Sequence, residues 1–292
     1  MELTSIEYIT RKRLPWAETV LIPLGDIQHQ TNRDAVDWRR LERVVAWGVE
    51  HNALWLGMGD FVDNESPSNR QALKTAGIYD SVVDALDYRS EELEDDIKKL
   101  LAPTVGRWVG TLGGHHYHVY QDGTTTDTRM AQYLKCPYLG DSAYVNLAFD
   151  MPKNQKQAPI TFNILARHGS GSGRTAGAPV NNIERQITGF DADLYVQGHT
   201  HQAGAVPRDR IYPYFGPKIG SLVHKTMYLV STGSFLKSYI DGHKRDGRAQ
   251  GMYPEKAGMN PAHLGVAKIW FRPRYETIMG RGEATIDLSV EV

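Results

Sequence analysis

The chain is poor in cysteine. Its 292 residues include a single one, Cys136, so no internal disulfide can form. Such a composition suits a reducing compartment. The first residues, MELTSIEYITRKRLPW, carry charges but no apolar stretch typical of a secretory signal. We therefore expect a cytoplasmic protein.

Long apolar runs and an excess of one charge are also absent. No apolar run approaches the ~20 residues that a membrane helix needs, so no membrane partner is expected. Lys and Arg number 33 against 34 Asp and Glu, a net charge of −1. Because no global field attracts DNA or an anionic membrane, any attraction for an anion must come from a local site.

The hydrophobic pattern of the first half predicts alternating strands and helices. ETVLIPLGD (18–26), ALWLGMGD (53–60) and RWVGTLGG (107–114) are predicted to be buried strands. Apolar residues at helical spacing predict helices over 35–51 and 78–101 between them. This alternation favours an α/β fold with a parallel core.

The second half is predicted to be richer in strands. They are expected at 144–149, 160–168, 193–199, 227–234 and 264–272, with a short helix near 180–188. Two long connections, 202–224 and 236–263, are rich in Gly, Pro, Tyr and basic residues, and loops of that length are usually functional or mobile. No linker divides the chain, so we expect one domain over 1–292, with a core of about 18–272 and both loops near the site.

Five of the predicted strands end in a polar cluster. The clusters are GDIQ (25–28), GD (59–60), GGHH (113–116), RHG (167–169) and GHTH (198–201). Open α/β sheets place their sites beyond the carboxyl ends of the strands, so these groups should converge on one crevice. A mixed set of carboxylates and imidazoles suits divalent transition metals. The donors are too many for one tetrahedral ion and about right for two.

The order of these clusters resembles the signature of the calcineurin-like metallophosphoesterases: D-x-H, GD, GNH[D/E], H and GHxH. The chain matches it as D-I-Q, GD, GHH, RHG and GHTH, over residues 18 to about 234, in a variant similar to those common among phage proteins. The resemblance implies a four-layer α/β/β/α sandwich, in which helices flank two mixed sheets. It also implies a two-metal hydrolase of phosphate esters, in the host cytoplasm if a phage encodes it.

The first departure from the signature is Gln28, which stands where the family usually has His. Residues two apart in an extended segment share a face, so Gln28 should lie beside Asp26 while His29 points elsewhere. A carboxamide oxygen is harder than an imidazole nitrogen and should favour Mn²⁺ or Mg²⁺ over Zn²⁺. The alternative, that His29 reaches the metal, stays open.

The second departure lies in LGGHHYH (112–118), which fits the signature in two registers. If Gly114 replaces the family's Asn, one ligand is lost and His115 is the catalytic histidine. If His115 replaces the Asn, it is a ligand and His116 is catalytic. We prefer the second register because it loses no ligand. His118 then lies beyond the motif and is expected to be structural or solvent-facing.

On the preferred register the resemblance implies two overlapping ligand sets. One ion would be held by Asp26, Gln28, Asp60 and His201, and the other by Asp60, His115, His168 and His199. Mn is the expected metal, with Fe, Zn, Ni or Mg as alternatives. Two divalent ions against two carboxylates leave a charge of about +2, which binds a phosphate and acidifies a bridging water. The resulting hydroxide would attack phosphorus, and His116 would protonate the leaving oxygen.

Other polar residues are expected to support this site. Asp63 should orient a neighbouring group. Arg174, in the loop 169–179, would clamp the phosphate, although a merely flexible connection explains that loop equally well. Basic residues within 237–248 could follow a polynucleotide, but acidic residues among them are equally typical of a solvated loop.

The expected function is hydrolysis of a phosphodiester, a nucleotide or a nucleic acid. A phosphomonoesterase for small metabolites and a non-catalytic scaffold are the alternatives, and a homo-oligomer is compatible with the sequence. Fold alone does not fix the substrate.

Overall fold

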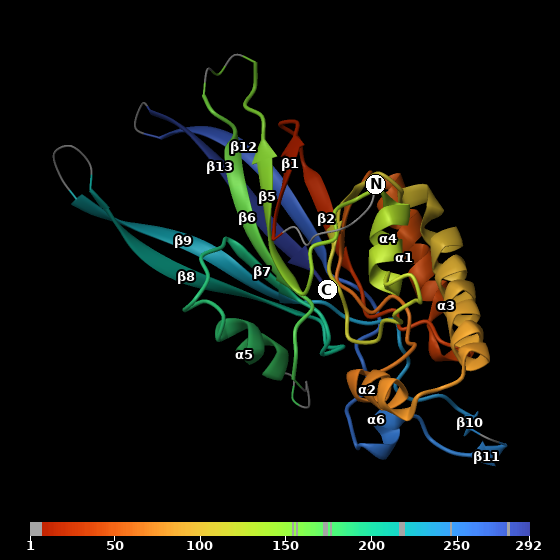
Figure 1. Ribbon diagram of the computed structural model, residues 1–292. Coiled ribbons are helices and arrows are strands. Elements are labelled where there is room, and N and C mark those ends of the chain that lie inside the picture. The colour runs from red at the N-terminus through yellow and green to blue at the C-terminus, as the bar shows by residue number, and fades with distance from the viewer. Residues whose placement is uncertain are drawn as a thin grey trace.

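A computed structural model of the chain has four layers, in the order α/β/β/α (Figure 1). The structure describes residues 8–153, 155, 157–171, 175, 177–215, 220–245, 247–278 and 281–292. Two mixed sheets form the inner layers, with strand orders β1-β5-β6-β7-β9-β8 and β13-β12-β2-β3-β4.

The five-stranded sheet contains the parallel core predicted for the first half of the chain. Its strands are β2 (Thr19–Leu24), β3 (Leu54–Gly57), β4 (Trp108–Thr111), β12 (Lys268–Ile278) and β13 (Arg281–Glu291). β2, β3 and β4 are parallel, and β12 is antiparallel to both β2 and β13. One face is covered by α1 (Trp38–Glu50), α3 (Asp80–Leu101) and α4 (Thr126–Leu134) (Figure 1). There, Leu41 of α1 and Ile97 of α3 join one apolar cluster with Trp55.

The six-stranded sheet carries a helix on its outer face. Its strands are β1 (Ile9–Leu14), β5 (Ser142–Phe149), β6 (Ile160–Arg167), β7 (Leu194–Gln197), β8 (Gly204–Phe215) and β9 (Gly220–Ser231). The outer helix is α5 (Ala178–Glu184), whose Ile183 packs in one cluster with Tyr195 and Leu229.

The inner faces of the two sheets pack against each other and form a shared core. Leu21 and Leu56 of one sheet lie in the same buried cluster as Leu147 and Ile164 of the other. Each such side chain contributes about 1.5–3 kcal/mol when fully buried. The predicted four-layer sandwich of two mixed sheets is therefore confirmed.

The prediction of a loop over 202–224 is wrong. Most of this segment belongs to the β8–β9 hairpin, which projects from the body of the protein (Figure 1). Pro207 and Pro213 weakened the strand pattern, but β8 is an edge strand, where a residue without an N–H is tolerated.

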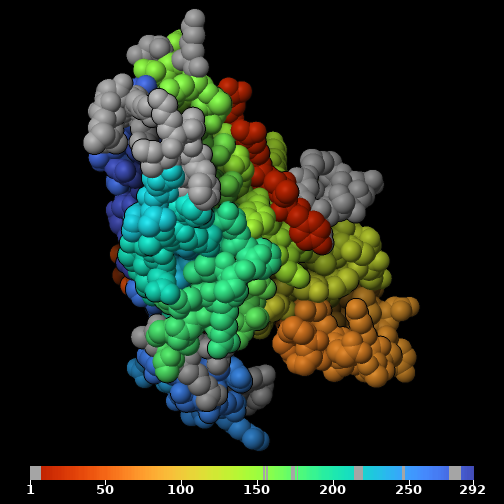
Figure 2. Space-filling model, turned by 90° about the vertical axis from the view of Figure 1, so that its left-hand side faces the viewer, coloured from red at the N-terminus to blue at the C-terminus, as the bar shows by residue number. Residues whose placement is uncertain are grey.

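The segment 236–263 lies at the opposite end, beyond the carboxyl ends of β2 and β3. It includes β10 (Lys244–Arg245), β11 (Arg248–Ala249) and α6 (Tyr253–Lys256). α2 (Pro67–Ala76) lies at the same end, and Figure 2 shows the two segments as separate projections there. In the part of the chain that the structure describes, no helix is long and apolar enough to cross a membrane. Short 3-10 turns, η1 (Arg33–Ala35) and η2 (Ala102–Thr104), complete the described helices.

Candidate metal centre

Five of the seven predicted ligands share an unusual backbone conformation. Positive φ angles of 49°, 50°, 51°, 67° and 56° occur at Asp26, Gln28, Asp60, His199 and His201, respectively. The other non-glycine residues with positive φ in the described ranges are Asn52 and Lys135, which follow α1 and α4, where left-handed residues commonly end helices. Strained residues persist only where the surroundings enforce them, and they concentrate at functional sites.

Asp60, directly after β3, is held by the chain that follows β4. Its Oδ1 accepts hydrogen bonds from the backbone N–H of His115 at 2.6 Å and of His116 at 2.9 Å. A Cβ at position 114 would lie 2.0 Å from this oxygen, so only glycine fits there. Because Oδ1 is already occupied, a cation bridged by Asp60 would have to be held through Oδ2.

Asp26 is fixed in the same way after β2. Its Oδ2 accepts a hydrogen bond from the backbone N–H of His199 at 2.9 Å, and a Cβ at Gly198 would lie only 2.7 Å from that oxygen. Its Oδ1 is buried without a hydrogen-bond partner among the described residues. His201 Nε2 lies 3.5 Å from Oδ1. The free oxygen and the imidazole therefore face a common point.

His168, after β6, has its tautomer set by the main chain. Its Nδ1–H donates to the Met58 carbonyl at 2.6 Å, so Nε2 is the ring nitrogen that can take up a proton or a metal ion. Nε2 lies 3.3 Å from Asp60 Oδ2. Burial acts to lower the pKa of His168, but Asp60 and Asp26 outweigh it and raise the pKa to about 10. The carboxylates thus favour a positive charge at Nε2. A bound proton provides this charge, and a metal ion would provide it in the same way.

The ligand atoms form two groups, and within each group they lie within 4.8 Å of one another. One group is His115, His168 and His199, and the other is Asp26, Asp60 and His168. His115 Nδ1 lies 3.2 Å from His199 Nδ1. Burial, followed by the charge of His168, lowers the pKa of His199 to about 4 and also lowers that of His115. Both rings are therefore neutral at pH 7, the state in which imidazole binds a metal. A carboxylate oxygen without a hydrogen-bond partner, such as Asp26 Oδ1, and neutral imidazoles are suitable ligands for divalent cations.

Gln28 lies in this cluster and His29 does not. Gln28 is buried, with Nε2 3.4 Å from Asp60 Oδ2, so its amide would have to turn over to present its oxygen to a cation. His29 instead lies 3.1 Å from Asp96 and packs edge-on against Trp38. The alternative in which His29 reaches the metal is therefore wrong.

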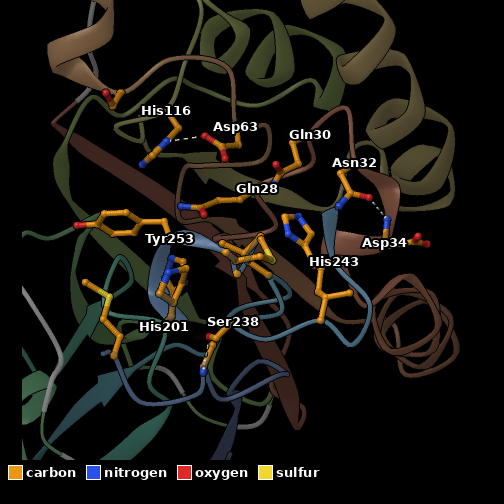
Figure 3. Close-up of a pocket in the computed structure, with 18 of the residues that line it drawn as sticks. Gln28, Gln30, Asn32, Asp34, Asp63, His116, His201, Ser238, His243 and Tyr253 are labelled. Carbon is orange, nitrogen blue, oxygen red and sulfur yellow. Dashed lines mark hydrogen bonds and ion pairs between the residues drawn. The ribbon is translucent and has the colours of Figure 1, made fainter. Parts of the chain in front are cut away.

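His116 lies outside both groups of ligand atoms and faces the adjacent pocket (Figure 3). Its Nδ1–H donates to Asp63 Oδ1 at 2.7 Å. Burial acts to lower the pKa of His116, but the bond to Asp63 and the charge of Asp60 raise it overall. The structure thus brings His115 into the cluster and pairs His116 with Asp63. The roles of the two histidines stay predictions, and Arg174 lies outside the described residues.

The third histidine of the motif, His118, is buried between two carboxylates. It donates from Nδ1 to Glu65 at 2.8 Å and from Nε2 to Asp87 at 2.6 Å. Burial acts to lower its pKa, but both carboxylates raise it above the ordinary 6.5. His118 therefore links the chain after β4 to that before α2 and to α3.

We expect His118→Gln to destabilise the fold more at low pH than at high pH. A raised folded-state pKa gives stability that is fully present below pH 6.5 and lost as pH rises through the folded value. Breaking such a buried pair costs about 3–5 kcal/mol where the histidine is charged. Urea unfolding at several pH values measures this, with the exposed His224→Gln on β9 as control. An equal loss at all pH values would contradict the charged pairing.

Sequence reasoning missed the amide side chains around this centre. Amide side chains of Gln30, Asn32, Asn64 and Asn69 line the pocket, and so does Tyr253 of α6. The four amides lie in irregular or terminal segments without hydrophobic periodicity or motif spacing. Only the length and composition of 236–263 pointed to that part of the pocket.

Comparison with known proteins is sparse. No protein-family model matches the chain, and no curated protein matches it. A solved structure of Vacuolar Protein Sorting 29 from Cryptosporidium parvum is 9% identical with a TM-score of 0.37, covering 94% of this chain and 100% of that one. A Vps29 double mutant from Entamoeba histolytica is 12% identical with a TM-score of 0.35, covering 93% and 99%. At these scores and identities the similarity carries no information about activity.

Proposed function

We propose that the protein is a dinuclear metal-dependent phosphoesterase that acts on a phosphodiester. The observation that carries the proposal is the pair of buried polar atoms, Asp26 Oδ1 and His168 Nε2, that have no hydrogen-bond partner among the described residues and face other ligand atoms. Buried polar atoms are rarely left unpaired in folded proteins. The ordered match to the metallophosphoesterase signature supports the same conclusion.

Each predicted ligand would serve one of two ions, or both. Gln28 Nε2 and His168 Nε2 lie 3.4 Å and 3.3 Å from Asp60 Oδ2. His168 belongs to both groups of converging ligand atoms, so Oδ2 of Asp60 would be the oxygen that two ions share. Divalent ions bound here, Mn²⁺ above all, would acidify water and stabilise the phosphoryl oxygens. The left-handed backbone at five of these residues keeps the ligand atoms in place before any ion binds.

His116 would act as the proton donor to the leaving oxygen. Asp63 holds its Nδ1–H, which fixes the ring and leaves Nε2 for the substrate. A pKa raised above the ordinary 6.5 favours the protonated imidazole, the form that a general acid requires. Asp63 would thus position His116, in agreement with the orienting role predicted for it.

The surroundings favour a diester over a monoester. Among the described residues that line the pocket, Lys244 is the only lysine or arginine, against Asp34, Asp63 and Asp241. A monoester carries up to two negative charges, so this acidic lining repels it more strongly than a diester. A diester carries one charge, which the two ions alone can hold.

Metal analysis together with an activity screen tests this function. Purified protein should hold about two divalent ions per chain and should hydrolyse bis(p-nitrophenyl) phosphate with Mn²⁺ faster than p-nitrophenyl phosphate. Chelation should abolish turnover, and Mn²⁺ should restore it. Near-zero metal without turnover would instead support a non-catalytic scaffold, and a preference for the monoester would support a phosphomonoesterase.

We expect Gln28→His to be tolerated and to shift metal preference toward Zn²⁺ or Fe. Histidine is among the residues that accept the left-handed conformation found at position 28, and the change restores an imidazole. Turnover measured across Mn²⁺ and Zn²⁺ titrations would show the shift. An unchanged preference would argue against Gln28 as a ligand.

A further inference from the structure

A large pocket opens beside the metal centre. Its volume is about 1210 Å³, and it extends from Gln28 and His201 to the segment 236–263 (Figure 3). Small-molecule sites are usually ~300–1,000 Å³, so this pocket has room for much more than a phosphate group. The residues that line the pocket therefore indicate which chemical group of the substrate lies beyond the phosphate.

The two walls of the pocket differ in chemistry. One wall comes from the segments after β2 and β3 and from α2, and it is lined by the amides of Gln30, Asn32, Asn64 and Asn69. The facing wall comes from 236–263 and combines polar residues such as Asp241, His243 and Lys244 with an apolar group formed by Ile240, Met252, Tyr253, Pro254 and Met259. Figure 3 shows Gln30 and Asn32 across the pocket from Tyr253, with Gln28 between them. A flat group with a polar edge and an apolar face fits between such walls.

The amide wall offers uncharged donors and acceptors that the protein does not use. The side chains of Gln30 and Asn69 make no hydrogen bond within the described part of the chain. Asn64 accepts from Ser90 through Oδ1, but its Nδ2 is buried without a partner in the described structure. Gln30 and Asn69 can each both donate and accept, as the edge of a heterocyclic base requires, whereas the oxygen of Asn32 already accepts from the Asp34 N–H.

The apolar group of the facing wall offers an aromatic face. Tyr253 is the first residue of α6, its side chain is 73% exposed, and its hydroxyl makes no hydrogen bond in the described residues. Met252 precedes it in the chain, and methionine side chains adapt readily to flat ligands. Base–aromatic stacking tolerates any base, because every base presents a π face.

The charge of the pocket decides between a single nucleotide and a strand. A groove that follows a polynucleotide needs a row of cations. Lys244 is the one lysine or arginine among the described lining residues, and three aspartates line the same pocket. Repeated phosphates would therefore find little to bind outside the metal centre.

We propose that the substrate is a phosphodiester of a single nucleoside, with its base held between Tyr253 and the amide wall. This assignment rests on the proposed function for the phosphate, which would lie at the metal centre. The base occupies the part of the pocket that a phosphate leaves empty, and the amides bind its polar edge.

Two esters with the same leaving group test the assignment. Thymidine 5′-(p-nitrophenyl) phosphate has a base, and methyl p-nitrophenyl phosphate has none. Tyr253→Ala should raise KM for the thymidine ester about tenfold, the usual size of one stacking contact, and should leave kcat and the methyl ester unchanged. Gln30→Ala should act in the same direction. Tyr88→Ala, on α3 and 65% exposed, does not line the pocket and serves as the control.

A binding measurement separates this proposal from the catalytic one. Saturation-transfer NMR with adenosine and thymidine on metal-free protein should detect both nucleosides, and the signal should be lost in Tyr253→Ala but retained in Tyr88→Ala. If neither ester is hydrolysed, the proposed function fails, but this measurement still shows whether the pocket binds a nucleoside. Absence of nucleoside binding would overturn the proposal. Stronger inhibition by a short single-stranded oligonucleotide than by thymidine monophosphate, with a difference that disappears steeply as salt is added, would also overturn the proposal.

Discussion

Asp60→Asn is expected to empty both metal sites at once and leave the fold intact. Asparagine Oδ1 can still accept the N–H groups of His115 and His116, so the two backbone hydrogen bonds are retained. Its amide nitrogen would replace Oδ2 and donate to His168 Nε2, which lies 3.3 Å from that position. The variant would thus satisfy the orphaned acceptor with a hydrogen bond and remove the one oxygen that two ions would share.

Metal content and thermal unfolding measure this result. Metal per chain should fall from about two to near zero, and turnover should fall by more than the roughly 10–100-fold that loss of an outer partner of a ligand costs. Excess Mn²⁺ should raise the Tm of the wild type by mass action but not that of the variant. In a chelator the two proteins should unfold at similar temperatures.

Asp63→Asn is the matched control for metal content. It makes the same chemical change at a carboxylate that contacts His116 and no predicted ligand. It should therefore keep both ions. If Asp60→Asn also kept two ions, or lost only one, the shared carboxylate would have to be sought elsewhere.

The sequence could predict that these candidate ligands converge because backbone geometry brings them together. Asp26, Asp60, His168 and His199 each follow a buried strand, and glycines stand where the chain approaches a carboxylate closely. Parallel neighbouring strands bring their carboxyl ends together, so residues far apart in sequence converge without any knowledge of side-chain packing. The four-layer fold itself was implied by the family resemblance, and the structure shows it.

The parts that could not be predicted depend on tertiary contacts. β1 pairs with β5, and β12 pairs with β2. Neither pairing can be predicted from the hydrophobic periodicity of the strands themselves. β8 contains two prolines and looked like a loop until its place at the edge of the sheet was known. His118 sits in the same motif as the catalytic candidates, yet its carboxylate partners lie more than thirty residues upstream. The pocket walls come from segments with no repeating pattern.

The pairing of His116 with Asp63 has a consequence for the pH profile. Asp63 helps raise the pKa of His116, so Asp63→Asn should lower that pKa. The protonated imidazole would then be lost at a lower pH, and the falling limb of the rate profile for an alkyl ester should move to lower pH. An unshifted limb would show that His116 is not the group that titrates.

The largest contrast is expected between alanine variants of the two adjacent histidines. His115 Nδ1 lies in a group of converging ligand atoms, so His115→Ala should lower metal occupancy, and excess Mn²⁺ should partly rescue activity. His116 lies outside the groups, so His116→Ala should keep both ions yet lose on the order of 10²–10⁴ in turnover, the usual contribution of a general acid. The fold should tolerate both changes, because Asp60 contacts these residues through their backbone N–H groups.

The leaving group separates proton donation from other roles of His116. An alkyl ester departs only with a proton, whereas a nitrophenyl ester departs readily without one. The loss in His116→Ala should therefore be largest for alkyl diesters and small for bis(p-nitrophenyl) phosphate, while His115→Ala should impair both equally. The reverse pattern, with metal lost in His116→Ala and kept in His115→Ala, would establish the other register. Gly114 would then take the place of the family's Asn, and the second ion would be held by one ligand fewer.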